Sequence, residues 1–266
     1  MILSVIIPCY NHGAFIDEAI ESVALCRGVE YEIIIVNDGS TDDTTKQKLA
    51  SLAQSGYCVI NHSNQGLAYS RNAGIATAKG KYILPLDADN KIKPEYIYKA
   101  LDILEKGNAD IVYAKPVFFG AIEKKRMFNC MPFNSKALHF ENYIDACALY
   151  RKEVWVATGG YSENMPFQGQ EDWEFWLHAF IKGFKFHFID EELYYYRIVK
   201  NSMIETSTEK DKEDANFKFI LNKHTSSYIP LMKENYTAWL IRKYENEHQV
   251  KTAVKYIGKY LKSAFN

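Results

Sequence analysis

The sequence predicts an α/β fold built on a mostly parallel sheet that is flanked by helices. The first observation is that short β-branched runs alternate with segments of helical spacing through the first hundred residues. The second is that these runs are apolar on both faces, as in parallel strands covered by helices on each side. The third is that 266 residues, 47% of them hydrophobic, are enough to bury a large core.

Four strands are predicted in this first part, at residues 3–8, 31–37, 57–61 and 81–86. The segment after the first strand has apolar residues at helical spacing, namely Phe15, Ala19, Ile20, Val23 and Ala24. Strands and helices that alternate in this way form right-handed βαβ units. Ligands of such sheets bind beyond the carboxyl ends of the strands, so the residues that follow each strand are the candidates for function.

The alternation becomes less regular after Asp110. Strands are predicted at 110–120, 126–133, 143–150, 184–189 and 193–198, with a helix at about 171–182. From about Glu205 to the end the pattern is helical and charged. We therefore expect one domain at 1–204, with halves at about 1–110 and 111–204, and a C-terminal helical extension at 205–266.

Composition excludes several classes of function. A net charge of −1 argues against a general affinity for nucleic acid, which needs a clustered positive field. Five cysteines without a CxxC spacing argue against a zinc ribbon, a redox pair or a disulfide framework, and they favour the reducing cytoplasm. The apolar run after Met1 is too short for a signal peptide, and no segment approaches the roughly 20 apolar residues of a membrane-spanning helix.

Polar residues follow the first two predicted strands. Tyr10 and Asp38 would face the same crevice, where an aromatic ring can stack on a nucleobase and a carboxylate can accept its imide proton. Much of the second segment has a simpler explanation, because Ser40, Thr41 and Asp42 are all residues that cap helices. A nucleotide pocket and an ordinary turn before a helix both stay open at this point.

The segment after the third predicted strand favours an anion site. Gly66 precedes a helical run, and the N–H groups at a helix N-terminus suit a phosphate. Arg71 lies further along this helix, beside small residues such as Gly74. The alternative is a surface arginine on an ordinary helix.

Asp87 and Asp89 follow the fourth predicted strand. In an extended chain residues i and i+2 point the same way, with Cα atoms roughly 6.6 Å apart. Two carboxylates aimed at one small volume repel each other unless a cation or protons lie between them. Mg²⁺ or Mn²⁺ accepts carboxylate and diphosphate oxygens together. The alternative is a solvated turn that starts the next helix.

Four segments in this order and spacing, "VIIPCYN", "EIIIVNDGSTDDT", "NQGLAYSRNAGI" and "YILPLDADN", resemble the family 2 inverting glycosyltransferases with the GT-A fold. The resemblance implies that Pro8, Tyr10 and Asp38 surround the nucleobase and that Arg71 lies near the base or the diphosphate. It implies that Asp87 contacts the ribose and that Asp89 holds Mn²⁺ or Mg²⁺. The implied nucleotide-sugar site comprises Pro8, Tyr10, Asn11, Asp38, Arg71, Asp87, Ala88 and Asp89.

The segment 149–186 is similar to the family's acceptor region, and this similarity implies that Asp172 is the catalytic base. Glu171, Trp173 and Arg197 are further candidates for contact with the acceptor or the diphosphate. From the residues alone, Glu171 and Asp172 lie at the exposed N-terminus of a helix, where acidic residues also complement the helix dipole.

The sequence departs from the family pattern at Val199, where the family often has a histidine that helps to hold the metal and diphosphate. The metal would then rest on Asp89, the donor diphosphate and water. Arg197, Lys200 and Asn201 remain candidates to contact the diphosphate.

The activity implied by the resemblance is metal-dependent, inverting transfer of a sugar from a nucleotide-diphosphate donor, expected to be a UDP-sugar. The expected acceptor is a hydroxyl of a glycan or a lipid-linked saccharide, in surface polysaccharide biosynthesis. Two alternatives are a non-catalytic nucleotide-sugar-binding scaffold and a sugar-phosphate nucleotidyltransferase. The latter should carry a glycine-rich loop with Arg and Lys after its first strand, which "PCYNHGAF" lacks.

The C-terminal segment has apolar residues at helical spacing, namely Val250, Val254, Ile257, Leu261 and Phe265, with lysines on flanking positions. Such a helix packs against its own domain or a dimer partner. A basic amphipathic helix also binds an anionic membrane surface. The expected location is the cytoplasm, with either a homodimer or a peripheral membrane contact formed by the C-terminal helices.

Overall fold

The computed structural model describes residues 2–121, 127–199 and 210–247. It divides into two compact units, Met1–Ile220 and Leu221–Asn266. The domain boundary predicted at residue 204 falls among residues that are not described, so it stays a prediction.

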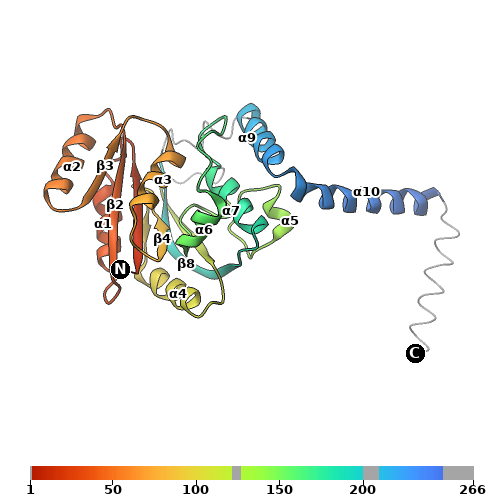
Figure 1. Ribbon diagram of the computed structural model, residues 1–266, viewed down its shortest axis with the longest axis horizontal. Coiled ribbons are helices and arrows are strands. Elements are labelled where there is room, and N and C mark those ends of the chain that lie inside the picture. The colour runs from red at the N-terminus through yellow and green to blue at the C-terminus, as the bar shows by residue number, and fades with distance from the viewer. Residues whose placement is uncertain (1, 122–126, 200–209, 248–266) are drawn as a thin grey trace. The chain divides into compact units, whose positions relative to one another are not determined.

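The first unit is built on one eight-stranded sheet with the strand order β3-β2-β1-β4-β7-β6-β8-β5 (Figure 1). The four strands β3, β2, β1 and β4 lie side by side in this order and are parallel to one another. Strands β7 and β5 run antiparallel to their neighbours. This arrangement confirms the predicted α/β fold with a mostly parallel sheet. The strands are β1 (Leu3–Cys9), β2 (Tyr31–Asp38), β3 (Cys58–His62), β4 (Tyr82–Pro85), β5 (Lys91–Ile92), β6 (Ile111–Gly120), β7 (Leu149–Arg151) and β8 (Phe186–Ile198).

Helices flank this sheet. In the described part of the first unit these are α1 (Ile16–Ala24), α2 (Asp43–Gln54), α3 (Leu67–Thr77), α4 (Pro94–Glu105), α5 (Ser135–Leu138), α6 (Lys152–Thr158), α7 (Glu171–Ile181) and most of α9 (Lys210–Lys223). Helix α10 (Thr225–Glu247) belongs to the second unit. Helix α3 packs closely on β1 and β2 because Gly74 has no side chain. A Cβ atom there would lie 2.5 Å from Cγ2 of Ile6.

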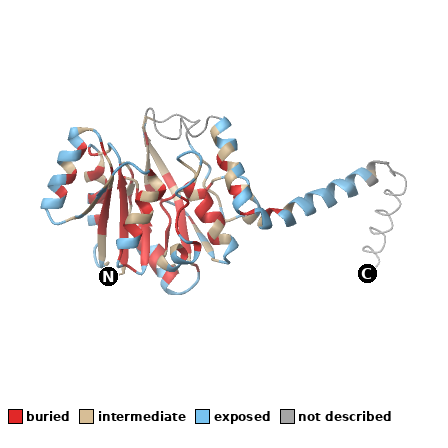
Figure 2. Cartoon of the chain, turned by 45° about the horizontal axis from the view of Figure 1, so that its top comes forward, coloured by how far each residue is buried: buried red, intermediate tan, exposed pale blue. Residues whose placement is uncertain are grey.

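The core lies on both faces of the central strands, as Figure 2 shows by the buried residues along them. All seven residues of β1 are buried, so this strand is covered on both sides, as its mostly apolar sequence predicts. Because β1 lies between β2 and β4 and is parallel to both, the residues that follow these three strands lie at the same edge of the sheet.

Two of the strand predictions for the second half were wrong, and two others describe one strand. Residues 127–133 contain no strand. In the segment 143–150 only the end belongs to β7, because Asp145 accepts a hydrogen bond from the amide of Cys147, which turns the chain. The strands predicted at 184–189 and 193–198 are one continuous strand, β8, which pairs with β6 through register shifts near Lys115.

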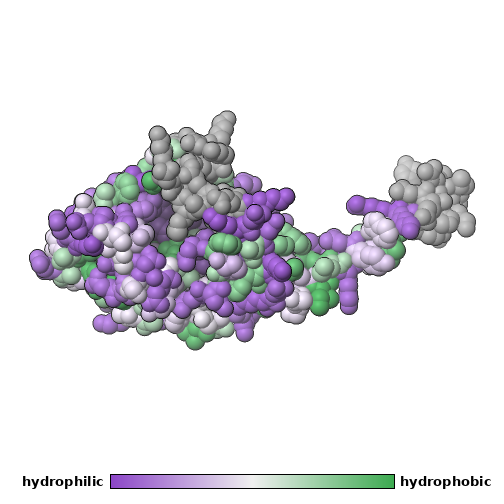
Figure 3. Space-filling view, turned by 90° about the horizontal axis from the view of Figure 1, so that it is seen from above, coloured by the Kyte–Doolittle hydropathy of each residue, from purple (hydrophilic) through white to green (hydrophobic). Residues whose placement is uncertain are grey.

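The second unit contains the end of α9 and the whole of α10. Its exposed large apolar residues are Ile229, Met232, Tyr236, Trp239, Leu240 and Ile241, and Figure 3 shows apolar and polar residues side by side on this helix. Among the described helices, none combines the length and the apolar character needed to span a bilayer. The amphipathic helix predicted around Val250–Phe265 lies outside the described residues.

Candidate active site

The loops after β1 and β2 are joined by one side chain. Asn11 adopts a left-handed backbone conformation with a φ of 56°. Its Oδ1 accepts hydrogen bonds from the amides of Thr41 (2.8 Å) and Asp42 (3.2 Å). Asp42 in turn caps α2 by accepting a hydrogen bond from the amide of Thr45. The neighbouring ring of Tyr10 is 43% exposed and stays open to a ligand.

Asp38 lies at the end of β2 and organises the loop that leads into α3. Its two carboxylate oxygens accept hydrogen bonds from the amides of Gln65 (2.8 Å) and Gly66 (3.0 Å). His62 lies 3.3 Å from the same carboxylate. Gly66 has a φ of 94°, a conformation that favours glycine, so the amides of this loop can turn toward Asp38. The predicted contact of Asp38 with a nucleobase stays a prediction.

Asp87 and Asp89 lie in a turn between β4 and β5. The amide of Asn90 donates a hydrogen bond to the carbonyl of Asp87 (2.9 Å), so the segment is not the extended chain that the sequence analysis assumed. The alternative of a turn before the next helix is therefore correct for the backbone. The carboxylate of Asp87 pairs with Arg71, whereas no pairing with a described residue is seen for that of Asp89.

Arg197, near the end of β8, holds this turn in place. Its amide donates to Oδ1 of Asn90 (2.8 Å), and its Nε donates to the carbonyl of Asp89 (2.9 Å). The guanidinium also donates to Glu18 (2.8 Å) and lies over the rings of Phe15 and Phe119. Arg197 therefore fixes the backbone of the acidic turn, a role that sequence reasoning did not foresee.

The carboxylate of Asp89 receives no hydrogen bond from another residue that the structure describes. Burial raises the pKa of Asp89 to about 6, and the nearby His12 and Arg197 oppose that rise. A partly buried carboxylate without a neutralising neighbour in contact suits a divalent cation. The residues present thus fit the metal implied by the family resemblance, with Asp89 as the protein ligand.

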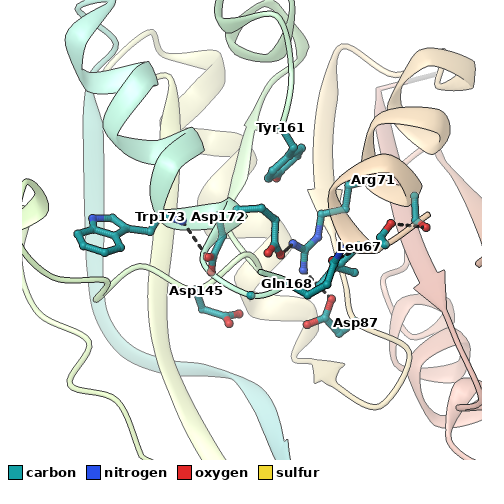
Figure 4. Close-up of polar contacts among 12 residues, drawn as sticks. Leu67, Arg71, Asp87, Asp145, Tyr161, Gln168, Asp172 and Trp173 are labelled. Carbon is teal, nitrogen blue, oxygen red and sulfur yellow. Dashed lines mark hydrogen bonds and ion pairs between the residues drawn. The ribbon is translucent and has the colours of Figure 1, made fainter. Parts of the chain in front are cut away.

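Arg71 lies at the centre of the site and joins the two halves of the first unit (Figure 4). Its side chain is only 2% exposed. The guanidinium donates to Asp87 (2.9 Å) and to Glu171, and it lies 5.6 Å from the ring centroid of Tyr161. The predicted contact of Arg71 with a base or diphosphate stays a prediction, because in the structure its partners are these two carboxylates.

The start of α7 is not exposed as the sequence analysis expected. Glu171 is buried because it pairs with Arg71. Asp172, the next residue, accepts hydrogen bonds from the backbone amide of Trp173 (2.8 Å) and from Nδ2 of Asn142 (3.1 Å). Burial and the charge of Glu171 raise the pKa of Asp172 to about 7, against the opposing charge of Arg71.

Asp145 is a site residue that sequence reasoning missed. Figure 4 shows it near Asp172 and Asp87 in the region around Arg71. Burial and the charge of Asp87 raise its pKa to about 7. The segment around it was predicted as a strand at 143–150, so the only available signal was a carboxylate in an otherwise apolar stretch.

Trp173 is 3% exposed. Its Nε1 donates to the carbonyl of Leu138 (2.6 Å), and its ring stacks on Phe217 of α9 at a centroid distance of 5.9 Å. These contacts pack α7 against its neighbours. The acceptor contact predicted for Trp173 stays a prediction, and Lys200 and Asn201 lie outside the described residues.

The loop before α7 reaches across to α3. Oε1 of Gln168 accepts a hydrogen bond from the amide of Leu67 (3.1 Å) at the N-terminus of α3. Further along α3, Nδ2 of Asn72 donates hydrogen bonds to the carbonyl of Tyr161 (2.9 Å) and to the carboxylate of Glu163 (2.7 Å). Oδ1 of Asn72 accepts one from the amide of Tyr161 (2.9 Å). Two segments about ninety residues apart are thus tied together around the site.

Comparison with known proteins gives one family. A model of glycosyl transferase family 2 matches residues 4–155. An uncharacterized glycosyltransferase of Haemophilus influenzae is 28% identical over 216 residues, which cover 77% of this chain and 72% of that protein. The uncharacterized glycosyltransferase EpsJ of Bacillus subtilis is 30% identical over 225 residues, covering 77% and 63%. Glycosyltransferase GlyG of Streptococcus pneumoniae is 33% identical over 113 residues, which span only 38% of its length.

Solved structures show the same fold. TarS 1–349 of Staphylococcus aureus, in complex with UDP-GlcNAc, superposes with a TM-score of 0.63 at 19% identity, covering 81% of this chain and 64% of that one. The mannosyltransferase PcManGT of Pyrobaculum calidifontis, in complex with GDP-Man and Mn²⁺, gives a TM-score of 0.55 at 16% identity, covering 75% and 58%. Since the family model covers more than half of the chain, the protein belongs to glycosyl transferase family 2.

Proposed function

We propose that the protein transfers a sugar from a nucleotide-diphosphate donor to an acceptor hydroxyl, with inversion at the anomeric carbon. One observation carries the proposal. Asp172, a half-buried aspartate whose pKa is raised to about 7, directly follows Glu171, which pairs with Arg71, and Arg71 also pairs with Asp87 of the acidic turn. The proposed base and the proposed leaving-group site are thus connected through one arginine, and a single displacement requires both in one site.

The donor is proposed to bind at the edge of the sheet formed by the ends of β1, β2 and β4. The exposed ring of Tyr10 would stack on the base, next to Pro8 and Asp38. Asn11 shapes this pocket because it holds the loop at Thr41 and Asp42. UDP is the favoured nucleotide, and solved complexes of TarS with UDP and with UDP-GlcNAc support it by analogy of fold.

Asp89 would hold Mn²⁺ or Mg²⁺, and the neighbouring Ala88 and Asp87 would face the donor. A bound divalent ion supplies positive charge against the diphosphate that leaves. Arg197 keeps Asp89 in position because its Nε donates a hydrogen bond to the backbone carbonyl of Asp89. Among the solved structures of this fold, PcManGT was obtained with Mn²⁺, which supports the same choice of metal.

Asp172 would accept the proton of the acceptor hydroxyl as that oxygen attacks the anomeric carbon. A base with a pKa near 7 is half deprotonated at neutral pH and strong enough to accept a proton. Asn142 and the amide of Trp173 hold one carboxylate oxygen, so the other is oriented for the proton. Arg71 and Glu171 position α7 and do not react.

The acceptor is proposed to be a glycan or a lipid-linked saccharide in surface polysaccharide biosynthesis, on the cytoplasmic side. The apolar residues exposed on α10 support a contact through the C-terminal helices, either with a second copy or with the surface of a membrane.

The test of the proposal is a screen of UDP-, dTDP- and GDP-sugars with Mn²⁺, measured as release of the nucleotide. We expect release from at least one donor, and we expect Asp172→Asn to reduce it at least 100-fold while UDP binding is unchanged. Normal release by Asp172→Asn would contradict the assignment of the base. A scaffold that binds the donor without reacting would release no nucleotide with any donor.

A further inference from the structure

Asn216 of α9 is a fully buried polar residue that the proposed chemistry does not use. It lies in the part of α9 that belongs to the first unit. Among the described residues its side chain makes three hydrogen bonds, each to the backbone of the loop that precedes α7. Oδ1 accepts from the amide of Phe167 (3.0 Å), and Nδ2 donates to the carbonyls of Phe167 and Gly169 (3.1 Å each).

This loop leads directly into the proposed base. Gly169 is followed by Gln170, whose φ of 97° is left-handed, and then by Glu171 and Asp172 at the start of α7. A residue other than glycine adopts that conformation only where its surroundings hold it there. The hydrogen bond from Asn216 to the carbonyl of Gly169 is one such restraint, because it fixes the peptide that precedes Gln170.

The next residue of α9 acts on the same helix. Phe217 stacks on the ring of Trp173, which follows Asp172 directly. Helix α9 thus restrains the chain before Asp172 by hydrogen bonds and the chain after it by ring stacking. The same loop carries Gln168, whose side chain reaches the N-terminus of α3.

We propose that Asn216 is a positioning residue that sets where Asp172 points, and that α9 is therefore part of the catalytic unit. The inference rests on the proposed role of Asp172. Asn216 lies in the last part of the chain, beyond the domain boundary predicted at residue 204. In this proposal the site is therefore complete only when that part of the chain is present.

The test compares Asn216→Ala and Asn216→Asp with the wild type. Asn216→Asp keeps the volume and the acceptor for the amide of Phe167, but it replaces the donor that serves both carbonyls. Lys218→Ala, at an exposed position of α9, is the matched control. The readouts are hydrogen exchange of peptides from 163–172, affinity for UDP with Mn²⁺, and kcat and KM for nucleotide release from the most active donor of the screen.

We expect both Asn216 variants to accelerate exchange in 163–172 and to lower kcat about 10- to 100-fold, because a misplaced base reacts poorly. KM and the affinity for UDP should stay within twofold, and Lys218→Ala should match the wild type. Unchanged kcat despite faster exchange would overturn the proposal. A parallel fall in UDP affinity and kcat would also overturn it, because that pattern indicates general loss of folded protein.

Failure of the proposed function has a different signature. If the wild type releases nucleotide from no donor of the screen, the transferase proposal fails. The exchange rates in 163–172 still decide whether Asn216 restrains the loop, and unchanged rates in both variants would overturn the inference by themselves.

Discussion

Arg71 and Glu171 form a buried ion pair between α3 and α7, although 100 residues separate them in the chain. Their side chains are 2% and 5% exposed. Because Arg71 also contacts Asp87, the pair couples the acidic turn after β4 to the helix that carries Asp172. The distance between the proposed metal ligand and the proposed base is thus set by a connected set of charged side chains.

Glu171→Gln is expected to destabilise the protein strongly. The amide can still accept a hydrogen bond, but the guanidinium of Arg71 loses one of its two charge partners in a buried site. Breaking a buried pair costs about 3–5 kcal/mol, which corresponds to a fall in Tm of roughly 6–20 °C for a protein of this size. Thermal unfolding followed by circular dichroism measures the shift.

The matched control is Glu191→Gln, which removes the same charge from the exposed pair of Glu191 with Lys99. Exposed pairs contribute little, so the Tm of this variant should fall by less than a third as much. Equal shifts in the two variants would show that the buried pair has no special role in stability.

The pH dependence of kcat should report Asp172. Burial and the charge of Glu171 raise its pKa to about 7, and a base must be deprotonated to act. We therefore expect kcat to rise with pH up to about 7 and to level off above it. An ordinary aspartate would already be deprotonated at pH 5, so a flat profile between about pH 5 and 8 would contradict this assignment.

Asp145→Asn should stabilise the protein in a pH-dependent manner. The pKa of Asp145 is raised from 3.8 to about 7, so the folded state binds a proton more tightly than the unfolded state does. Its contribution to stability is fully present below about pH 4 and is lost as the pH rises through 7. Asparagine avoids this loss and can still accept the hydrogen bond from Cys147.

The Tm of Asp145→Asn should therefore exceed that of the wild type at pH 8 and match it near pH 4. Asp102→Asn, at an exposed position of α4, serves as the control and should show no such trend. A gain in Tm that is equal at both pH values would argue against titration of Asp145 as the cause.

Removal of metal should abolish nucleotide release. Asp89 is the carboxylate of the acidic turn without a hydrogen bond from another described residue, and a divalent ion would neutralise it. We expect EDTA to stop release, Mn²⁺ or Mg²⁺ to restore it, and Asp89→Asn to lose both the activity and its rescue. Undiminished activity after thorough chelation would exclude the metal.

Local sequence patterns predicted the elements that depend on local chemistry. The apolar runs at 3–8 and 31–37 correspond to β1 and β2, and the helix expected at 171–182 corresponds to α7. The spacing of apolar residues indicates each of these elements, and a short stretch of the sequence is enough to show it. The placement of Asp87 and Asp89 after a central strand follows from the same patterns.

The parts that could not be predicted depend on contacts between distant segments. Glu171 appeared exposed because acidic residues are common at helix N-termini, and only its pairing with Arg71, 100 residues away, explains its burial. Gln168 meets Leu67 across 101 residues, and Asn216 meets the same loop across 49. No periodicity marks such side chains, because tertiary packing alone gives them partners.

The acidic turn has a further consequence for how the protein folds. Strands β4 and β5 are separated by only five residues, 86–90, yet they occupy the fourth and the eighth places in the sheet. A local hydrogen bond between Asp87 and Asn90 closes the turn, but Arg197 can hold it only after β8 lies beside β5, and that contact spans 107 residues. Such distant pairings form late, because a long loop must close before they contribute.

A growing or truncated chain that lacks β8 would therefore lack the contacts with Arg197 that hold the proposed metal turn in place. A ligand that binds only the completed turn stabilises the folded state in proportion to RT ln(1 + [L]/Kd). Metal or donor bound at Asp89 would stabilise the turn together with its contacts to Arg197. Binding would therefore also oppose the unfolding of β8, which is far away in the chain.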